Sequence, residues 1–123
     1  MRYMCLVHLD PAIMRNATQE QRQDLDRRSL GYDEKLQAEG HYVIAEAIEG
    51  SESAVLVRVR GGQMSSTDGP YIETKEQMAG FILIEARDMN EAVRLAAGIP
   101  IAEIGTIEVR PVFEFPAPPP VAK

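Results

Sequence analysis

The chain has a single cysteine, a shortage of basic residues and no long apolar run, and each of these excludes a class of protein. Cys5 alone cannot form a disulfide within the chain, so we expect a reducing, cytoplasmic compartment. The 13 Lys and Arg face 19 Asp and Glu, giving a net charge of −6, so neither nucleic acid nor an anionic membrane is an expected partner. The apolar runs fall short of the roughly 20 residues that cross a bilayer, and no signal-peptide pattern follows Met1.

The motifs of common catalytic and cofactor sites are missing as well. The chain has two histidines, His8 and His41, and we find no metal-ligand motif. There is no glycine-rich phosphate loop, and no Ser-His-Asp or Cys-His arrangement can be nominated. We therefore expect no metal and no cofactor. Cys5 lies among apolar residues of a predicted strand, which favours a buried, inert thiol.

The length and composition are those of one globular domain. With 123 residues, of which 45% are hydrophobic, the chain can bury roughly 65% of its unfolded surface. We place this domain at residues 1–115. The proline-rich residues 116–123 are expected to form an extended, mobile tail.

Hydrophobic periodicity and capping signals predict the order of the elements. Thr18 with Gln21 is a capping box, and Gly40 is a helix stop. Gly61-Gly62 fits a hairpin turn with positive φ. The predicted elements are a strand at 2–9, a helix from the Thr18 cap to Glu39, strands at 41–48 and 54–60, a return strand at 63–67, a helical turn at 75–78, a strand at 80–86, a helix capped by Asp88 with Met89, Ala92, Val93 and Ala96 inward, and a strand at 107–115.

With the hairpin set aside, this order is the α+β, ferredoxin-like β-α-β-β-α-β pattern. Two helices cover only one face of a four-stranded sheet. The strands at 2–9, 41–48 and 80–86 are apolar on both faces, so the second face also needs a cover. A second subunit packed sheet against sheet is the economical answer, and we expect a two-fold homodimer.

The inward stripe of the first helix holds two candidate binding residues. Leu25, Ser29, Tyr32 and Leu36 share one face at 3.6 periodicity. Ser29 and Tyr32 could line a pocket, or they could pack in the core with their hydroxyls satisfied. We expect a small cavity between the sheet, this helix and the loop at 67–78.

The stretch at 67–77 combines a turn, charged side chains and a second capping pattern. Asp68 precedes Gly69 and Pro70, where its carboxylate could serve as an acid or base. The alternative is an aspartate that accepts backbone hydrogen bonds within its own turn. Lys75 could orient a polar ligand, or it could be a solvated surface charge.

Two strand residues are further candidates. His8, near the end of the first strand, could serve as an acid or base, and the alternative is a structural imidazole. Arg110, on the last strand, could hold a carboxylate by bidentate hydrogen bonds. Arg58 and Arg60 share a strand face, where a solvated cationic surface is the simpler interpretation.

Several separate stretches carry a family resemblance. Residues 67–81 (TDGPYIETKEQMAGF) resemble the signature of the DGPF branch of the YCII-related family, with Tyr71 where that branch usually has Phe. Residues 54–60, 107–112 and 1–4 are also similar to that branch. The resemblance covers nearly the whole chain except the proline-rich tail.

The resemblance implies a ferredoxin-like dimeric α+β barrel. YCII-type relatives are thought to carry a histidine–aspartate site, and their structural cousins include muconolactone isomerase-like and dehydrochlorinase-like enzymes. Members of the DGPF branch often accompany extracytoplasmic-function sigma factors. When the first helices are aligned at Lys35-Leu36-Gln37-Ala38-Glu39, the family's helix histidine falls on Ser29, which places histidine-centred chemistry in question here.

These observations combine into two hypotheses. The first is a cofactor-independent enzyme, or an enzyme-like binder, acting on a small polar organic molecule, with lyase- or isomerase-like chemistry by resemblance. The second is a non-catalytic sensor or interaction module associated with sigma-factor-type transcriptional regulation. The predicted catalytic residues are Asp68 and His8, and the predicted substrate-binding residues are Ser29, Tyr32, Lys75 and Arg110.

Overall fold

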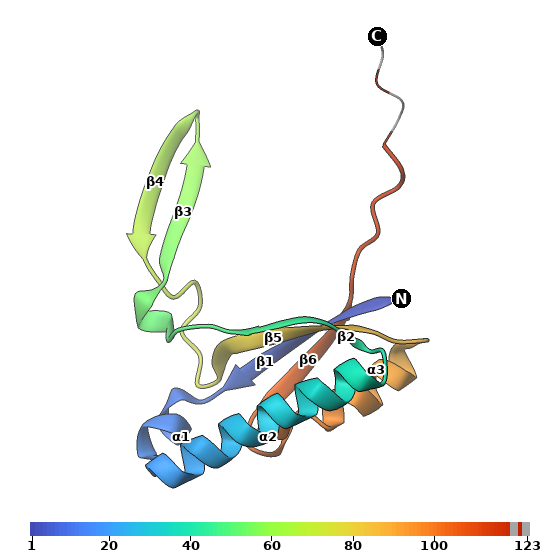
Figure 1. Cartoon of the computed structure of the whole chain (residues 1–123). Coiled ribbons are helices and arrows are strands. Elements are labelled where there is room, and N and C mark those ends of the chain that lie inside the picture. Colours follow the sequence, from blue (N-terminus) through green and yellow to red (C-terminus); the bar gives the residue numbers. More distant parts are fainter. Residues whose placement is uncertain (119–120, 122–123) are drawn as a thin grey trace.

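A computed structural model describes residues 1–118 and 121 of the chain. It has a four-stranded antiparallel sheet in the order β2-β5-β1-β6 and a separate two-stranded sheet, β3-β4 (Figure 1). This α+β arrangement is consistent with the predicted ferredoxin-like fold. The elements are β1 (Arg2–Leu9), α1 (Pro11–Asn16), α2 (Gln19–Ala38), β2 (Tyr42–Ala47), β3 (Val55–Arg60), β4 (Gln63–Asp68), β5 (Gln77–Glu85), α3 (Met89–Ala97) and β6 (Thr106–Pro111), with short 3-10 turns η1 (Ser51–Ser53) and η2 (Pro100–Glu103).

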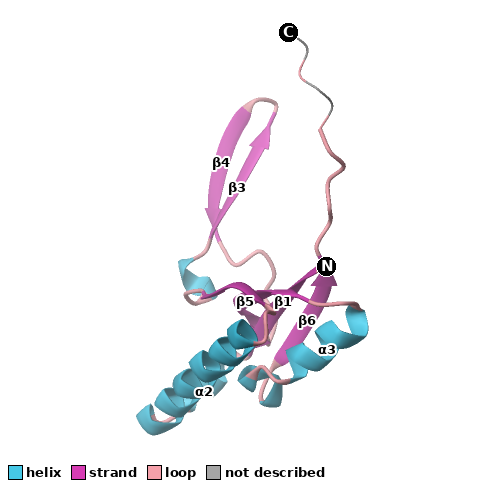
Figure 2. Cartoon of the chain, turned by 45° about the vertical axis from the view of Figure 1, so that its right-hand side comes forward, coloured by secondary structure: helices cyan, strands magenta, loops and turns pink. Residues whose placement is uncertain are grey.

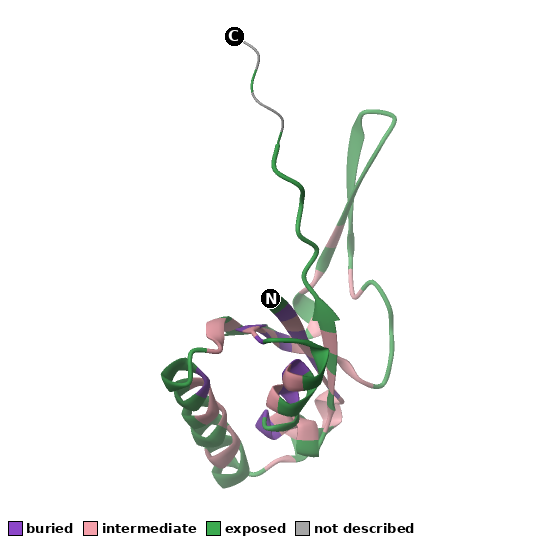
Figure 3. Cartoon of the chain, turned by 90° about the vertical axis from the view of Figure 1, so that its right-hand side faces the viewer, coloured by how far each residue is buried: buried purple, intermediate pink, exposed green. Residues whose placement is uncertain are grey.

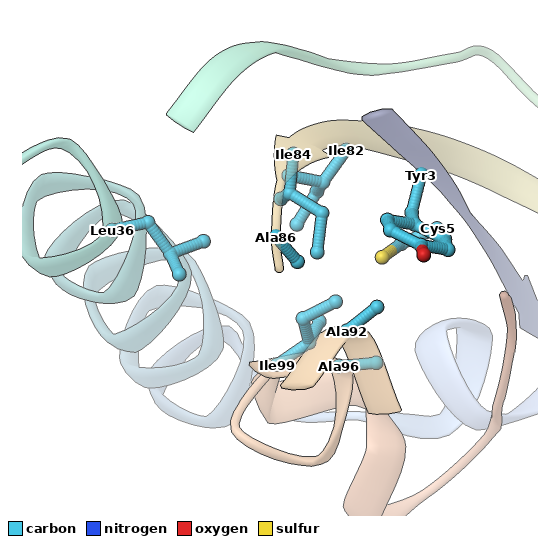
Figure 4. Packing of buried hydrophobic residues seen from close by; sticks show 9 residues of the cluster. All are labelled: Tyr3, Cys5, Leu36, Ile82, Ile84, Ala86, Ala92, Ala96 and Ile99. Carbon is cyan, nitrogen blue, oxygen red and sulfur yellow. The ribbon is translucent and has the colours of Figure 1, made fainter. Parts of the chain in front are cut away.

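The hydrophobic core lies between the main sheet and helices α2 and α3, which cover the same face of the sheet (Figures 1 and 3). Side chains alternate between the two faces of a strand, so the odd-numbered residues of β1 point into this core. Figure 4 shows Leu36 of α2 and Ala92 of α3 pointing toward Cys5 and Ile84 of the sheet. Cys5 is fully buried, as the sequence predicted. Burial raises the pKa of its thiol to about 11, which makes it unreactive.

The predicted helix signals act as expected at both long helices. Thr18 and Gln21 form a reciprocal capping box at the start of α2, and Gly40 follows that helix with φ of 80°. The Asp88 carboxylate accepts a hydrogen bond from the Glu91 amide at the start of α3. Each cap satisfies an amide that the first helical turn leaves without a partner.

The sequence analysis missed one helix, α1. Asp10 caps it by accepting a hydrogen bond from the Ala12 amide, and Pro11 occupies its first turn. Asp-Pro is a typical helix start, so the signal was present. The helix has only six residues, and Asp10-Pro11 is also typical of a turn.

Within residues 1–118 and 121, no α-helix covers the other face of the main sheet (Figure 1). Met4, Leu6, Phe81 and Leu83 are half-buried there, and Ile44 is 45% exposed. We call this surface the open face. It is the second apolar face that the strand patterns indicated.

The β3-β4 hairpin, which we call the arm, projects from the body of the molecule (Figure 2). It lies on the side of the sheet opposite α2 and α3 (Figure 1). Gly61 and Gly62 form its turn with φ of 57° and 77°, the positive values that the Gly-Gly pair was expected to supply.

Three details of the sequence analysis are wrong. No helical turn forms at 75–78, because β5 begins at Gln77 and Thr74 uses its hydroxyl to donate to the Glu76 carbonyl. On α3, the predicted inward residues Met89 and Val93 are 37% and 51% exposed, so only the alanines of that set are buried.

The last strand is also shorter than expected. β6 ends at Pro111 rather than at Phe115. The Val112 amide still donates a 3.0 Å hydrogen bond to the Arg2 carbonyl, but β1 begins at Arg2, so the strand has no partner beyond this point. β6 is an edge strand of the sheet, as this proline predicted. The expected mobile tail at 116–123 lies partly outside the described residues, and residues 116–118 have no helix or strand.

Candidate functional site

A cavity of about 410 Å³ lies between α2 and the covered face of the sheet. Its lining is largely apolar, and α2 adds the polar side chains. The residues that line it are Val7, Leu25, Asp26, Ser29, Leu30, Tyr32, Asp33, Ala45, Glu46, Ala47, Ala79, Gly80, Phe81, Ile82, Ile99, Pro100 and Ile101. The predicted pair Ser29 and Tyr32 is therefore in this cavity, whereas residues 67–78 do not line it.

Tyr32 has a structural task in the cavity wall. Its hydroxyl donates a 2.6 Å hydrogen bond to the Leu95 carbonyl and so joins α2 to α3. A Cβ atom on Gly98 would collide with the ring, so glycine is required there. Burial raises the pKa of Tyr32, with smaller contributions from Glu39 and Cys5. The Tyr32 hydroxyl proton is therefore used in this hydrogen bond, and the ring contributes an apolar surface to the cavity.

Asp33 is a cavity residue that the sequence analysis missed. It follows Ser29 by four positions, so the two side chains share a helix face. Burial raises the pKa of the Asp33 carboxyl above its usual range. The charged residues that line the cavity are Asp26, Asp33 and Glu46, but the register of β2 turns the Glu46 side chain to the open face, so the two aspartates of α2 supply the acidic side chains. The four-residue spacing between Ser29 and Asp33 was the signal in the sequence that could have identified Asp33 as a cavity residue.

The open face carries a second polar group of residues. His8 Nε2 lies 3.0 Å from Glu108 Oε1, and the His8 side chain is 28% exposed. The Thr106 hydroxyl, opposite His8 in the β1-β6 ladder, donates a 2.7 Å hydrogen bond to Glu76 Oε1. Arg110 pairs with Met4 further along the same face and is exposed. An imidazole oriented by a carboxylate can act as an acid or base. Of these residues, only His8 and Arg110 were predicted from the sequence as site residues.

Most of the motif at 67–77 is exposed. Asp68 ends β4 opposite Val55, and its side chain faces solvent, not a closed cavity. The Gly69 amide donates a 2.8 Å hydrogen bond to the Ala54 carbonyl, and a Cβ on Gly69 would lie 2.8 Å from the Ala54 Cβ. Gly69-Pro70 is a cis peptide bond. Glycine is therefore needed here for close packing of two chain segments.

The same loop borders a shallow hollow of about 550 Å³. Its lining residues are Ser51, Glu52, Gly69, Pro70, Glu73, Thr74, Lys75 and Gln77. Lys75 is exposed on its rim. A larger hollow of about 860 Å³ lies beside α1, where Arg15 and Arg22 stand with Glu49 and Glu52 among apolar residues. Both signs of charge line these two hollows, so neither favours a ligand of one charge.

The predicted site residues thus lie at three places in one chain. Ser29 and Tyr32 are in the cavity under the sheet, His8 and Arg110 are on the open face, and Asp68 and Lys75 are in the exposed loop. The two predicted catalytic residues are not in contact with the cavity.

Two general properties complete the description. Within residues 1–118 and 121, no three His, Cys, Asp or Glu side chains gather in a way that could hold a metal ion. In the same described part of the chain, none of the helices has the length and apolar character needed to cross a membrane.

Comparison with known proteins gives a family but no activity. The family model described as the YCII-related domain matches residues 1–116. An uncharacterized protein of Rhizobium meliloti (strain 1021) is 31% identical over 105 residues, which cover 84% of this chain and 75% of that protein.

Proposed function

This chain belongs to the YCII-related family, and we propose that it binds a small polar organic molecule in the cavity between α2 and the main sheet. The observation that carries this proposal is the cavity itself. Its volume of about 410 Å³ lies in the range of roughly 300–1,000 Å³ that is usual for small-molecule sites. Polar groups of Ser29 and Asp33 meet there within a mostly apolar lining, the composition of a site that both desolvates and orients a ligand.

The acidic lining defines the chemistry of the ligand. The acidic side chains of the lining are Asp26 and Asp33, and both come from α2. A molecule with an apolar body and an amine or another hydrogen-bond donor complements this lining, whereas a carboxylate would be repelled. Asp33, with its pKa raised by burial, is the proposed acid or base if the bound molecule reacts. The reaction would be a cofactor-independent lyase- or isomerase-like step, or binding alone.

We also propose that two chains form a homodimer through their open faces. Half-buried apolar side chains such as Leu6, Phe81 and Leu83 support this, because an open apolar sheet face of this kind marks an interface. His8 and Arg110 would then lie between the subunits, where they are candidates to contact a second ligand or each other's chain. The 67–81 stretch supports placement in the DGPF branch, and the single buried cysteine fits the cytoplasm.

Thermal shift with matched ligand series tests the binding proposal. The probes are primary amines, neutral amides and carboxylates on the same small hydrocarbon skeletons. Amines are expected to raise the melting temperature, because ligands stabilise the folded state they bind. Asp33→Asn should abolish this shift, whereas Glu34→Gln, an exposed change on the same helix, should retain it.

A second variant tests whether the ligand binds in the cavity or at another place on the chain. Ser29→Phe places a bulky side chain in the cavity and should remove the shift for every series. If no compound of any series shifts the melting temperature, or if the shift survives Ser29→Phe, the cavity is not a ligand site.

The alternative function, a sensor or interaction module, has one observation in its favour. Asp68, Glu73 and Lys75 are exposed on a charged loop, as a docking surface for a protein requires. The partner implied by the family resemblance is an extracytoplasmic-function sigma factor. Binding to such a purified factor should weaken in the double variant Asp68→Ala/Lys75→Ala and persist in Glu34→Ala. Equal affinity in both variants would reject the loop as the docking surface.

A further inference from the structure

The arm is a two-stranded hairpin that stands apart from the main sheet. β3 and β4 pair with each other and form their own sheet. A hairpin of two strands alone is only marginally stable in water. Figure 3 shows that nearly all of the arm is exposed. Such an element needs a further surface to pack on.

One side of the arm is mostly apolar. Val57 pairs with Ser66 and Val59 with Met64, and these residues share one side of the hairpin with Val55, whose partner Asp68 lies at the base of the arm. We call this side the valine face. Val55, Val57, Val59 and Met64 are between 58% and 69% exposed. The opposite side holds polar residues, with Arg58 paired to Ser65 and Arg60 to Gln63.

The total accessible surface indicates how large the missing contact is. The chain exposes 9120 Å², whereas a compact monomer of 13.6 kDa exposes about 6,600 Å². The excess is about 2,500 Å², and the arm and residues 112–118 project from the body (Figure 2). A standard interface buries about 800 Å² on each partner and a permanent dimer more. The excess is therefore large enough to form such an interface.

A matching apolar groove lies between α3 and β6. Its volume is about 420 Å³. All of its lining residues are apolar: Met89, Val93, Ala96, Ala97, Ala102, Ile107 and Val109. Met89 and Val93, which the sequence predicted to be buried, are exposed at this groove. The arm of the same chain lies on the opposite side of the sheet (Figure 1), so it does not fill this groove.

We propose that the valine face of each arm docks in the α3-β6 groove of a second copy of the chain. The inference rests on the homodimer proposed above and goes beyond it. Six residues of strand span about 20 Å, and stacked sheets lie about 10 Å apart, so an arm that rises past the partner's sheet reaches the partner's helical layer. Under two-fold symmetry the contact is made twice. Each arm then buries its valine face, and each groove receives its cover.

Two adjacent serines provide a matched test. Ser66 is on the valine face, paired with Val57, and Ser65 is on the opposite face, paired with Arg58; both are exposed. Ser66→Asp puts a charge into the proposed contact, and the dimer dissociation constant should rise at least about tenfold, since a buried unpaired charge is costly. Ser65→Asp should leave the constant unchanged. Analytical ultracentrifugation measures both, and circular dichroism confirms that both variants fold.

Disulfide cross-linking tests whether the α3-β6 groove is the surface that receives the arm. In the double variant Val57→Cys/Val93→Cys, the two new thiols should form a covalent dimer under mild oxidation, and each single variant should remain largely uncrosslinked. Cys5 does not interfere, because it is buried and its thiol pKa is about 11. Cross-linking of Val57→Cys alone would mean that two arms meet each other, and would overturn the assignment of the groove.

The outcomes also separate this inference from the homodimer itself. A monomer at micromolar concentration would overturn both. A dimer whose dissociation constant is equally insensitive to Ser66→Asp and Ser65→Asp would leave the sheet-to-sheet dimer in place and reject arm docking.

Discussion

The two faces of the main sheet are both apolar, but one is buried and the other is partly exposed. On β1, Tyr3 and Cys5 are 2% and 0% exposed, whereas their neighbours Met4 and Leu6, on the other face, are only half-buried. The strand residues do not make this difference. It arises because α2 and α3 lie on one side of the sheet (Figure 1). The covered face stabilises the single chain, and the open face, which includes His8 and Arg110, leaves apolar side chains partly exposed.

The largest expected effect contrasts two adjacent residues of β5. Ile84 is 1% exposed on the covered face, and Leu83 is half-buried on the open face. Ile84→Ala should lower the free energy of unfolding by about 3–4 kcal/mol, because it creates a core cavity. Leu83→Ala should cost the single chain only about 1 kcal/mol. Urea unfolding at low protein concentration measures both, and equal costs would contradict the distinction between the two faces.

The next effect concerns a hydrogen bond within the helical layer. Tyr32→Phe removes the donor to the Leu95 carbonyl, and the free energy of unfolding should fall by about 1–2 kcal/mol as that carbonyl loses its partner. Tyr71→Phe is the matched control, since Tyr71 is 75% exposed. It should leave the unfolding free energy unchanged. A neutral Tyr32→Phe would show that α2 and α3 do not depend on this bond.

A smaller effect sharpens the contrast between the covered and the solvent side of α2. A Cβ on Gly31 would meet nothing within 4 Å, so Gly31→Ala should stabilise the chain by about 0.5–1 kcal/mol through helix propensity. The same substitution at Gly40, where φ is 80°, should instead destabilise it. Urea unfolding compares the two. Loss of stability in Gly31→Ala would mean that this side of α2 is also covered.

The smallest effect is a pH dependence from Asp33 in the cavity. Burial raises its folded-state pKa, so the folded chain binds the proton more tightly than the unfolded chain. The resulting stabilisation is present below the unfolded pKa of about 4 and is lost as pH rises through the folded pKa. Asp33→Asn should therefore raise the melting temperature at neutral pH and lose this advantage below about pH 4. Glu34→Gln serves as the control, and an advantage independent of pH would contradict burial as the cause.

Local signals in the sequence were sufficient for most of the fold. The capping box at Thr18, the stop at Gly40 and the Gly61-Gly62 turn each determine a boundary through contacts within a few residues. The same kind of signal failed at Thr74, because β5 needs Gln77 for pairing with Leu9 of β1. A distant strand partner thereby overrides a local capping pattern.

The site was less predictable than the fold, for a related reason. The inward stripe of the first helix left two roles open for Ser29 and Tyr32. Both lie at the cavity, and the Tyr32 hydroxyl is satisfied by the Leu95 carbonyl. Asp33 was missed because its burial depends on β2 and η2, which close the cavity from elsewhere in the chain. Asp68 stands in a distinctive motif, but the conformation of the 67–77 loop leaves it exposed.

The sequence by itself determined the order of the strands and of helices α2 and α3, the two apolar faces of the sheet and the buried position of Cys5, because periodicity and capping act over short distances. Only the tertiary structure decided which face the helices cover, that Asp33 joins Ser29 at a cavity, and that the arm projects on the open side. These features depend on where segments far apart in the chain pack together. A local pattern carries no information about that arrangement.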